Sequence, residues 1–134
     1  PLRDFCASGR PVWGTCAGAI LLAREVDRLD RPGIETMEIS VHRNAFGRQI
    51  DSFEADLDIA GLEGGPFHAV FIRAPRIESI RFPAQPIATL DDGTIVAARQ
   101  ENLLATSFHP ELTGDTRLHA FFLTIGRPPG GPAK

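Results

Sequence analysis

Cys16 stands in the pentapeptide GTCAG, between a short apolar run and a stretch of helix-forming residues. A nucleophile flanked by glycines at this spacing is typical of the sharp strand-to-helix turn that presents a catalytic side chain. There the thiol would lie at a helix N-terminus, which favours the thiolate, and the amide of Ala17 could stabilise an oxyanion. Side chains at Gly14 or Gly18 would collide with the adjoining strand and helix. A buried structural cysteine fits the pentapeptide equally well, so the choice depends on finding a base.

A cysteine nucleophile needs a general base and a group that orients the base. His109 ends the apolar segment LLATSF, at the kind of strand end where α/β active sites collect. Glu111 follows two residues later, so its carboxylate can lie beside the imidazole and hold its tautomer; an exposed acid is the alternative. These two residues, joined to the cysteine turn, favour a Cys–His–Glu triad. The other histidines fit structural or solvated positions: His42, His68 and His119.

The segments around these residues alternate between strand and helix patterns. Strands are predicted at 11–14, 36–44, 52–60, 67–75, 76–82 and 103–109, a hairpin at 87–100, and helices at 1–9, 16–26 and 116–125, the last capped by Thr113 or Asp115. The strand–turn–helix unit at 11–26 requires a parallel crossover, whereas hairpins are antiparallel. The sequence therefore predicts an α/β fold with a mixed, partly parallel sheet flanked by helices.

Length and composition are typical of one globular domain. The chain has 134 residues, of which 43% are apolar, enough for a hydrophobic core. Its formal charge of −3 comes from interspersed acids and bases, which argues against nucleic acid as a partner. No apolar stretch is long enough to cross a bilayer, and no signal peptide is visible. We assign residues 1–126 to the domain and residues 127–134 to a flexible tail rich in proline and glycine.

The two cysteines differ in their surroundings. Cys6 shares an apolar helical stripe with Leu2 and Phe5, lacks flanking glycines and is predicted to be a core residue. Neither Cys6 nor Cys16 has zinc-ligand spacing to other cysteines or histidines, so we expect no structural metal. The sequence leaves a disulfide between them open. Two cysteines in a chain of this length are more typical of a reducing compartment, which favours the cytoplasm.

Five stretches together resemble one protein family. GTCAG followed by FHPEL is similar to the triad class of glutamine amidotransferases, in which cysteine, histidine and glutamate come in this order. RNAFGRQIDSFEADL at 43–57, FIRAP at 71–75 and ARQENLLATSFHPELTGDTRLHAFFL at 98–123 narrow the resemblance to the glutaminase subunit of pyridoxal 5′-phosphate synthase. The resemblance runs from residue 1 to the end of the last predicted helix. The RNxFGRQ and FIRAP stretches are more specific to this subfamily than the triad motif is.

The resemblance implies hydrolysis of L-glutamine to glutamate and ammonia. The ammonia would pass to a partner synthase subunit, a (β/α)₈ barrel, within a hetero-oligomer that makes pyridoxal 5′-phosphate, vitamin B6. The glutaminase half would need no metal and no cofactor. Neither nucleic acid nor a membrane is an expected partner.

The resemblance also assigns roles to residues. Cys16 would attack the carboxamide, His109 would move the protons, and Glu111 would orient His109. Ala17 would supply one oxyanion donor. Contacts with glutamine are implied for three residues: Arg43, Ile72 and Arg73. A solvated or interfacial ion pair is the alternative for the two arginines.

The sequence departs from the family at its start. The family has a glycine-rich loop of PGGES type upstream of the cysteine turn, which supplies a second oxyanion donor, and this chain begins after that point. We therefore expect a fragment or a natural truncation. Two alternatives stay open: a catalytically inactive subunit that docks on the synthase, and a glutamine amidotransferase that serves another acceptor. The RNxFGRQ and FIRAP stretches argue against the second.

Overall fold

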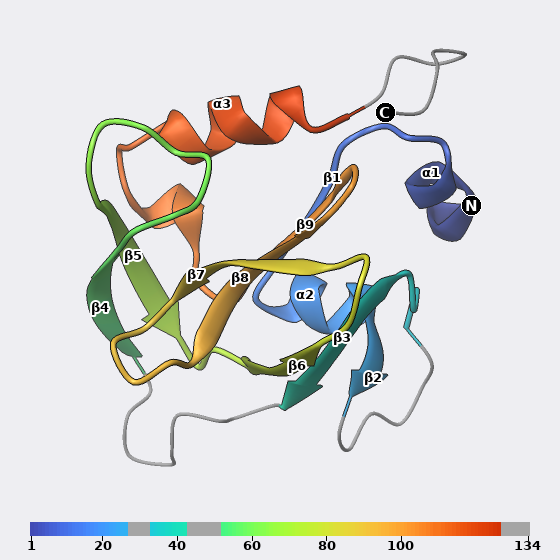
Figure 1. Ribbon diagram of the computed structural model, residues 1–134, viewed down its shortest axis with the longest axis horizontal. Coiled ribbons are helices and arrows are strands. Elements are labelled where there is room, and N and C mark those ends of the chain that lie inside the picture. Colours follow the sequence, from blue (N-terminus) through green and yellow to red (C-terminus); the bar gives the residue numbers. More distant parts are fainter. Residues whose placement is uncertain (27–32, 43–51, 127–134) are drawn as a thin grey trace.

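The computed structural model describes residues 1–26, 33–42 and 52–126. The centre of the fold is a mixed sheet of seven strands (Figure 1). Six strands lie in the order β1-β9-β8-β6-β3-β2, and β7 pairs with β8. Their bounds are β1 Val12–Thr15, β2 Ala23–Val26, β3 Met37–His42, β6 Arg76–Ile80, β7 Gln85–Thr89, β8 Ile95–Gln100 and β9 Leu103–Thr106. The β1–β9 and β2–β3 pairs are parallel and the other pairs are antiparallel, which confirms the predicted mixed sheet.

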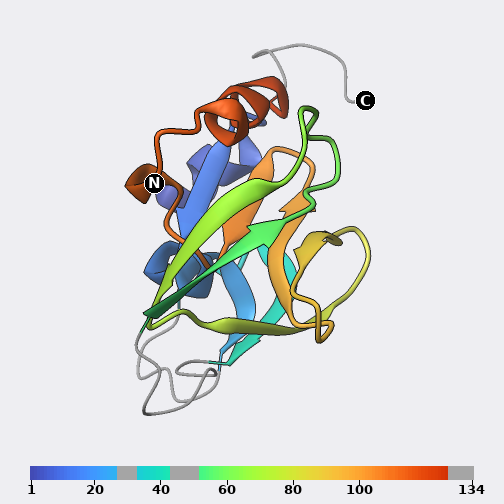
Figure 2. The same cartoon turned by 90° about the vertical axis from the view of Figure 1, so that its left-hand side faces the viewer.

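A second, two-stranded sheet lies against the first. It consists of β4 Ser52–Leu57 and β5 Phe67–Ile72, which are antiparallel. Figure 2 shows this pair as a separate layer in front of the larger sheet. The helices are α1 Leu2–Ala7, α2 Ala17–Leu22, the 3₁₀ turn η1 Pro110–Leu112 and α3 Arg117–Thr124. No helix in the described ranges is long and apolar enough to span a membrane.

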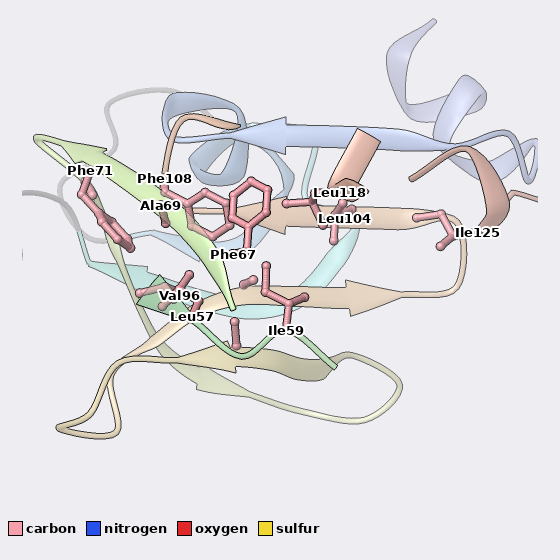
Figure 3. Close-up of a cluster of buried hydrophobic side chains, with 13 residues drawn as sticks. Leu57, Ile59, Phe67, Ala69, Phe71, Val96, Leu104, Phe108, Leu118 and Ile125 are labelled. Atoms are coloured by element: carbon pink, nitrogen blue, oxygen red, sulfur yellow. The ribbon is translucent and has the colours of Figure 1, made fainter. Parts of the chain in front are cut away.

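The core is divided between the two faces of β9. Leu104 belongs to a cluster that fills the space between the two sheets and under α3, where the rings of Phe67, Phe71 and Phe108 meet (Figure 3). Leu103 points to the opposite cluster, which α2 covers. All four residues of β9 are buried, because successive side chains of a strand point to opposite faces and both faces of this strand are covered. The strand that leads to His109 is therefore rigidly held.

The predicted helix at 16–26 is wrong in its second half. Helix α2 ends at Leu22, and residues 23–26 form β2, which lies parallel to β3. The carbonyls of Leu21 and Leu22, which would accept hydrogen bonds from the next helical turn, instead accept the N–H groups of Ile34 at 2.7 Å and Thr36 at 3.0 Å. Segment 33–36 thus ends the helix by tertiary contact, which overrides local propensity.

The predicted hairpin is present and begins two residues earlier than predicted, at Gln85. The hairpin turns at Asp92 and Gly93, whose φ of 90° places it in the left-handed region that favours glycine. In the first helix only Cys6 is buried, whereas Leu2 and Phe5 are exposed, so the predicted apolar stripe does not pack as a whole. Both cysteines are free thiols. The predicted tail, residues 127–134, lies outside the described residues.

Asn102 ties the first helix to the sheet. Its side-chain amide is buried and donates to the carbonyls of Cys6 and Arg10, each at 2.8 Å. We expect Asn102→Ala to lower the free energy of unfolding by about 2–3 kcal/mol, because two carbonyls lose their donor. Asn102→Asp keeps the shape, but its carboxylate offers no donor and would face two carbonyl oxygens, so it should destabilise at least as much. Urea unfolding measures both variants; an unchanged midpoint in either would contradict this role of the amide.

Candidate functional site

Cys16 forms the whole link between strand β1 and helix α2. Its φ of 51° and ψ of −105° lie in a region that non-glycine residues rarely adopt. The N–H of Cys16 donates to the carbonyl of Thr106 at 2.8 Å, and its carbonyl accepts the N–H of Ala19 at 3.0 Å. The strand-to-helix turn predicted from GTCAG is therefore present, with the cysteine at its strained position.

The two glycines of the pentapeptide have different roles. A Cβ atom on Gly14 would lie 2.4 Å from the carbonyl oxygen of Gly18, so no side chain fits at Gly14. A Cβ atom on Gly18 would meet nothing within 4 Å. The expected collision is confirmed for Gly14 and wrong for Gly18. The backbone of Gly18 blocks a side chain at Gly14, whereas the space next to the Cα atom of Gly18 is open.

The thiol of Cys16 is half-buried, and its Sγ lies 3.7 Å from the carbonyl oxygen of Ile72, as a thiol donor would. Burial raises the pKa of the Cys16 thiol above its ordinary value. The hydrogen bond from the Ala17 amide opposes this in part, and the charge of Glu111 adds to the rise. The sequence predicts a thiolate favoured by the helix N-terminus, whereas in the structure burial outweighs the hydrogen bond from Ala17 and raises the pKa of the thiol. Ionising this thiol requires a base.

His109 and Glu111 form a pair directly after β9. Nδ1 of His109 donates to Oε2 of Glu111 at 2.9 Å, because a carboxylate can only accept. This leaves Nε2 of the half-buried imidazole as the atom that can take a proton. Partial burial acts to raise the pKa of Glu111, but the hydrogen bond from His109 and the positive character of His109 and His119 outweigh it. The pKa of Glu111 therefore lies below its ordinary value.

The carboxyl ends of three strands bring these residues together. β1 and β9 are parallel neighbours with Thr15 opposite Thr106, so the segments that follow them leave the sheet at one edge. Cys16 follows β1, and the His109–Glu111 pair follows β9. The end of β5 joins them, since the backbone N–H of His109 donates to the carbonyl of Val70 at 2.8 Å.

The structure places two of the three residues implied to contact glutamine at this edge. Ile72 ends β5 beside the thiol. Arg73 follows with a φ of 46°; it and Cys16 are two of the four non-glycine residues with positive φ in the described ranges. Strained backbone of this kind clusters at functional sites. Arg43 lies outside the described residues, so its role stays a prediction.

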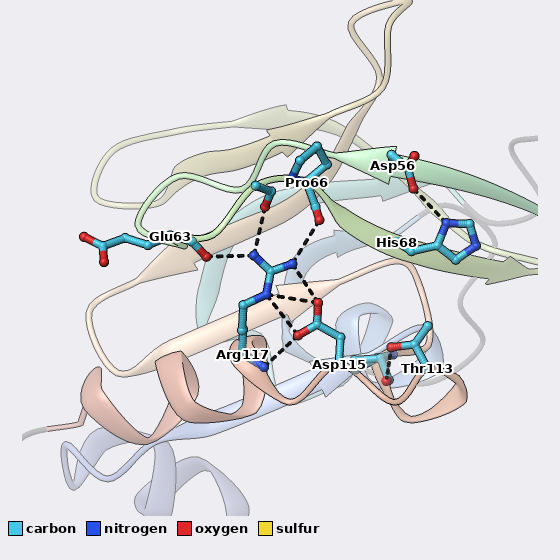
Figure 4. A network of polar contacts seen from close by, with 9 residues as sticks. Asp56, Glu63, Pro66, His68, Thr113, Asp115 and Arg117 are labelled. Atoms are coloured by element: carbon cyan, nitrogen blue, oxygen red, sulfur yellow. Dashed lines mark hydrogen bonds and ion pairs between the residues drawn. The ribbon is translucent and has the colours of Figure 1, made fainter.

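Two features near the site were not predicted from the sequence. The indole Nε1 of Trp13 donates to the hydroxyl of Thr106 at 3.1 Å, a contact between residues 93 positions apart. The guanidinium of Arg117 donates to the carbonyls of Glu63, Gly65 and Pro66 and pairs with Asp115 (Figure 4). It thereby anchors the start of α3, which follows the His109–Glu111 segment, to the loop between β4 and β5.

Neither of the two predicted caps, Thr113 and Asp115, caps the last helix: its N-cap residue is Thr116, whose side chain makes no capping hydrogen bond. Asp115 lies one residue earlier. Its Oδ1 accepts the backbone N–H of Arg117 at 3.0 Å, while the hydroxyl of Thr113 donates to Pro110 instead. The side chain and backbone N–H of Arg117 hold the pKa of Asp115 below its ordinary value. His68 bridges Glu54 and Asp56 on the exposed face of the small sheet, as a solvated structural histidine would.

The pKa of Glu111 gives stability a defined pH dependence. Because this pKa is lower in the folded than in the unfolded protein, its contribution is present above the unfolded value of about 4.3 and is lost as the pH falls through the folded pKa. We expect the difference in unfolding free energy between wild type and Glu111→Gln to shrink on acidification below about pH 4.5. Urea titrations at each pH measure it; a difference that grows on acidification would contradict the assignment.

Comparison with known proteins gives consistent matches over nearly the whole chain. A profile of the SNO glutamine amidotransferase family matches residues 1–125. "Pyridoxal 5′-phosphate synthase subunit PdxT" of Herpetosiphon aurantiacus is 56% identical over 93% of this chain and 67% of its own length. The protein of the same name from Moorella thermoacetica is 58% identical over 93% of this chain and 66% of its own length. The chain thus spans about two thirds of these relatives.

Two solved structures are similar to this chain in fold. One described as "Crystal structure of glutamine amidotransferase" superposes with a TM-score of 0.85 and 46% sequence identity, over 92% of this chain and 65% of that chain. Another, described as a GMP synthase subunit from Thermoplasma acidophilum, superposes with a TM-score of 0.63 over 92% of this chain and 61% of that chain. At 15% identity the second likeness shows the fold alone.

Proposed function

Because the chain belongs to the SNO glutamine amidotransferase family, we propose that it hydrolyses L-glutamine to glutamate and ammonia with Cys16, His109 and Glu111. The observation that carries the proposal is geometric. A cysteine on a strained strand-to-helix turn and a histidine–carboxylate pair leave the sheet at the ends of two neighbouring parallel strands. These are the parts that a thiol hydrolase needs, namely a nucleophile, a base and an orienting group.

The first half of the reaction forms a thioester. Nε2 of His109 takes the proton of the Cys16 thiol, whose raised pKa makes such a base necessary. The sulfur attacks the carboxamide carbon, and the amide of Ala17 donates to the resulting oxyanion. The imidazolium then protonates the departing nitrogen, so that ammonia leaves and a glutamyl thioester remains on Cys16. Glu111 stabilises the imidazolium through its bond to Nδ1.

The second half returns the enzyme to its starting state. His109 takes a proton from water, and the hydroxide attacks the thioester carbon. The C–S bond breaks, glutamate leaves, and the sulfur of Cys16 recovers its proton from the imidazolium. The same nitrogen thus serves as base and acid in both halves, so its orientation by Glu111 matters throughout.

For substrate binding we propose the backbone at Ile72 and Arg73, together with Arg43. The carbonyl of Ile72 already approaches the thiol, so a carboxamide bound beside Cys16 would lie within reach of it. A guanidinium suits the α-carboxylate of glutamine. The strained backbone at Arg73 supports a role at the site.

The ammonia is proposed to pass to a synthase subunit of (β/α)₈-barrel type, in a hetero-oligomer that makes pyridoxal 5′-phosphate. The relatives' name, which is that of a synthase subunit, supports this. Ile72 and Leu112 expose apolar side chains beside the site, 40% and 51% accessible, and a docked partner would cover them. The two free thiols suit a reducing compartment, which is why we propose the cytoplasm.

Release of ammonia and glutamate from L-glutamine tests the proposal. The folded chain is assayed alone and with the synthase subunit, and L-asparagine, one methylene shorter, serves as the control substrate. We expect release from L-glutamine that depends on Cys16. No release under either condition would contradict the proposal and favour an inactive docking subunit.

A further inference from the structure

Thr106, the last residue of β9, contacts both halves of the proposed site while completely buried. Its carbonyl accepts the N–H of Cys16 at 2.8 Å. Its hydroxyl lies 3.1 Å from Nε1 of Trp13 and 3.3 Å from the carbonyl oxygen of Phe108. An indole nitrogen can only donate, so the hydroxyl accepts from Trp13 and directs its own hydrogen to Phe108.

The carbonyl of Phe108 belongs to the peptide group that carries His109. The nitrogen of that group donates to the carbonyl of Val70 at 2.8 Å. The peptide plane is therefore held at its oxygen by the hydroxyl of Thr106 and at its nitrogen by β5. Because this plane precedes the Cα atom of His109, holding it places the Cα atom from which the imidazole extends.

The donor that orients this hydroxyl is itself held in place. The indole of Trp13 packs edge-on against His119, with ring centroids 5.1 Å apart, and against Phe122 at 5.4 Å. Both residues lie on α3. The chain of contacts thus runs from α3 through Trp13 and Thr106 to the backbone of His109.

We propose that Thr106 is a positioning residue for His109 and that Trp13 sets the direction of the Thr106 hydroxyl. The inference rests on the proposed function, in which Nε2 of His109 must meet first the thiol and then the departing ammonia. Small displacements of a reacting group cost large factors in rate, whereas the binding of glutamine does not depend on this hydroxyl. The effect should therefore appear in kcat and leave KM unchanged.

The test compares two substitutions at Thr106 in the glutaminase assay. Thr106→Val keeps the shape and removes the hydroxyl, and we expect kcat to fall by about tenfold with KM within about twofold of wild type. Thr106→Ser restores the hydroxyl and should keep kcat within about twofold. Trp13→Phe removes the N–H donor together with part of the packing against α3, and its kcat should fall between those of the two Thr106 variants.

The neighbouring Ser107 supplies a matched control. Its buried hydroxyl donates to the carbonyl of Val96 at 3.1 Å, away from His109. Ser107→Ala should therefore lower stability and leave kcat within about twofold. A kcat of Thr106→Val within about twofold of wild type would overturn the inference, as would an equal loss in Ser107→Ala.

A second readout separates this inference from the proposed function. The rate at which iodoacetamide alkylates Cys16 is followed against pH by mass spectrometry, which needs no glutamine turnover. We expect Thr106→Val to shift this profile toward that of His109→Ala, while Thr106→Ser and Ser107→Ala keep the wild-type profile. Absence of turnover in the wild type would count against the proposed function alone. An unshifted profile in Thr106→Val would overturn the positioning role.

Discussion

Cys16→Ala should abolish glutamine hydrolysis, with a loss of at least about 10³-fold, while the protein remains folded. The proposed site has no second thiol that could form the acyl intermediate, because the other cysteine in the chain, Cys6, lies in α1 and is buried in the core. Ammonia release measures the loss, and circular dichroism with urea unfolding measures the fold.

Cys6→Ala is the matched control for that loss. It removes a thiol from the core, 5% exposed, and should lower the unfolding free energy by about 1 kcal/mol while leaving turnover within about twofold. Cys16→Gly adds a stability readout, since glycine adopts a φ of 51° without strain and should stabilise the inactive protein by about 1 kcal/mol. Turnover retained in Cys16→Ala, or lost in Cys6→Ala, would contradict the assignment of the nucleophile.

Gly14→Ala should destabilise the protein by about 3 kcal/mol or more, the largest effect on stability that we expect from a single methyl group. The new Cβ would lie 2.4 Å from the oxygen and 2.5 Å from the carbon of the Gly18 carbonyl. Backbone atoms cannot rotate away as a side chain can, so β1 and α2 would have to separate. Urea unfolding measures the change.

Gly18→Ala carries the opposite expectation and serves as its control. A Cβ there meets no atom within 4 Å, and Gly18 lies inside α2, where alanine is the better helix former. We expect a gain of about 0.5–1 kcal/mol. Equal destabilisation by the two substitutions would contradict the explanation that close packing of β1 against α2 excludes a side chain at Gly14.

The parts of the site that the sequence predicted correctly are those defined by local pattern. The glycines around Cys16 mark the turn, and the spacing from His109 to Glu111 suffices for their hydrogen bond. The strand predicted at 103–109 is likewise present, although it ends at Thr106, three residues before the histidine. Each of these features depends on residues within a few positions of one another.

What the sequence missed depends on residues far apart in the chain. Helix α2 ends where it does because segment 33–36 binds the carbonyls of Leu21 and Leu22. The pKa of Cys16 is raised because the thiol is half-buried beside Ile72 and feels the charge of Glu111, neither of which a helix N-terminus alone indicates. The bond between Trp13 and Thr106 joins two strands that only the parallel register brings together. The hydrophobic periodicity of a single helix or strand cannot predict such contacts between distant segments.

The most direct measurement is to look for the glutamyl thioester itself. The chain is mixed with L-glutamine in the presence of the synthase subunit, quenched in acid within the first turnovers and digested, and its peptides are analysed by mass spectrometry. We predict a glutamyl adduct on the peptide that contains Cys16, and none on the peptide that contains Cys6 or in the Cys16→Ala variant. Ammonia release without any adduct on Cys16, or an adduct on another residue, would contradict the Cys16–His109–Glu111 mechanism.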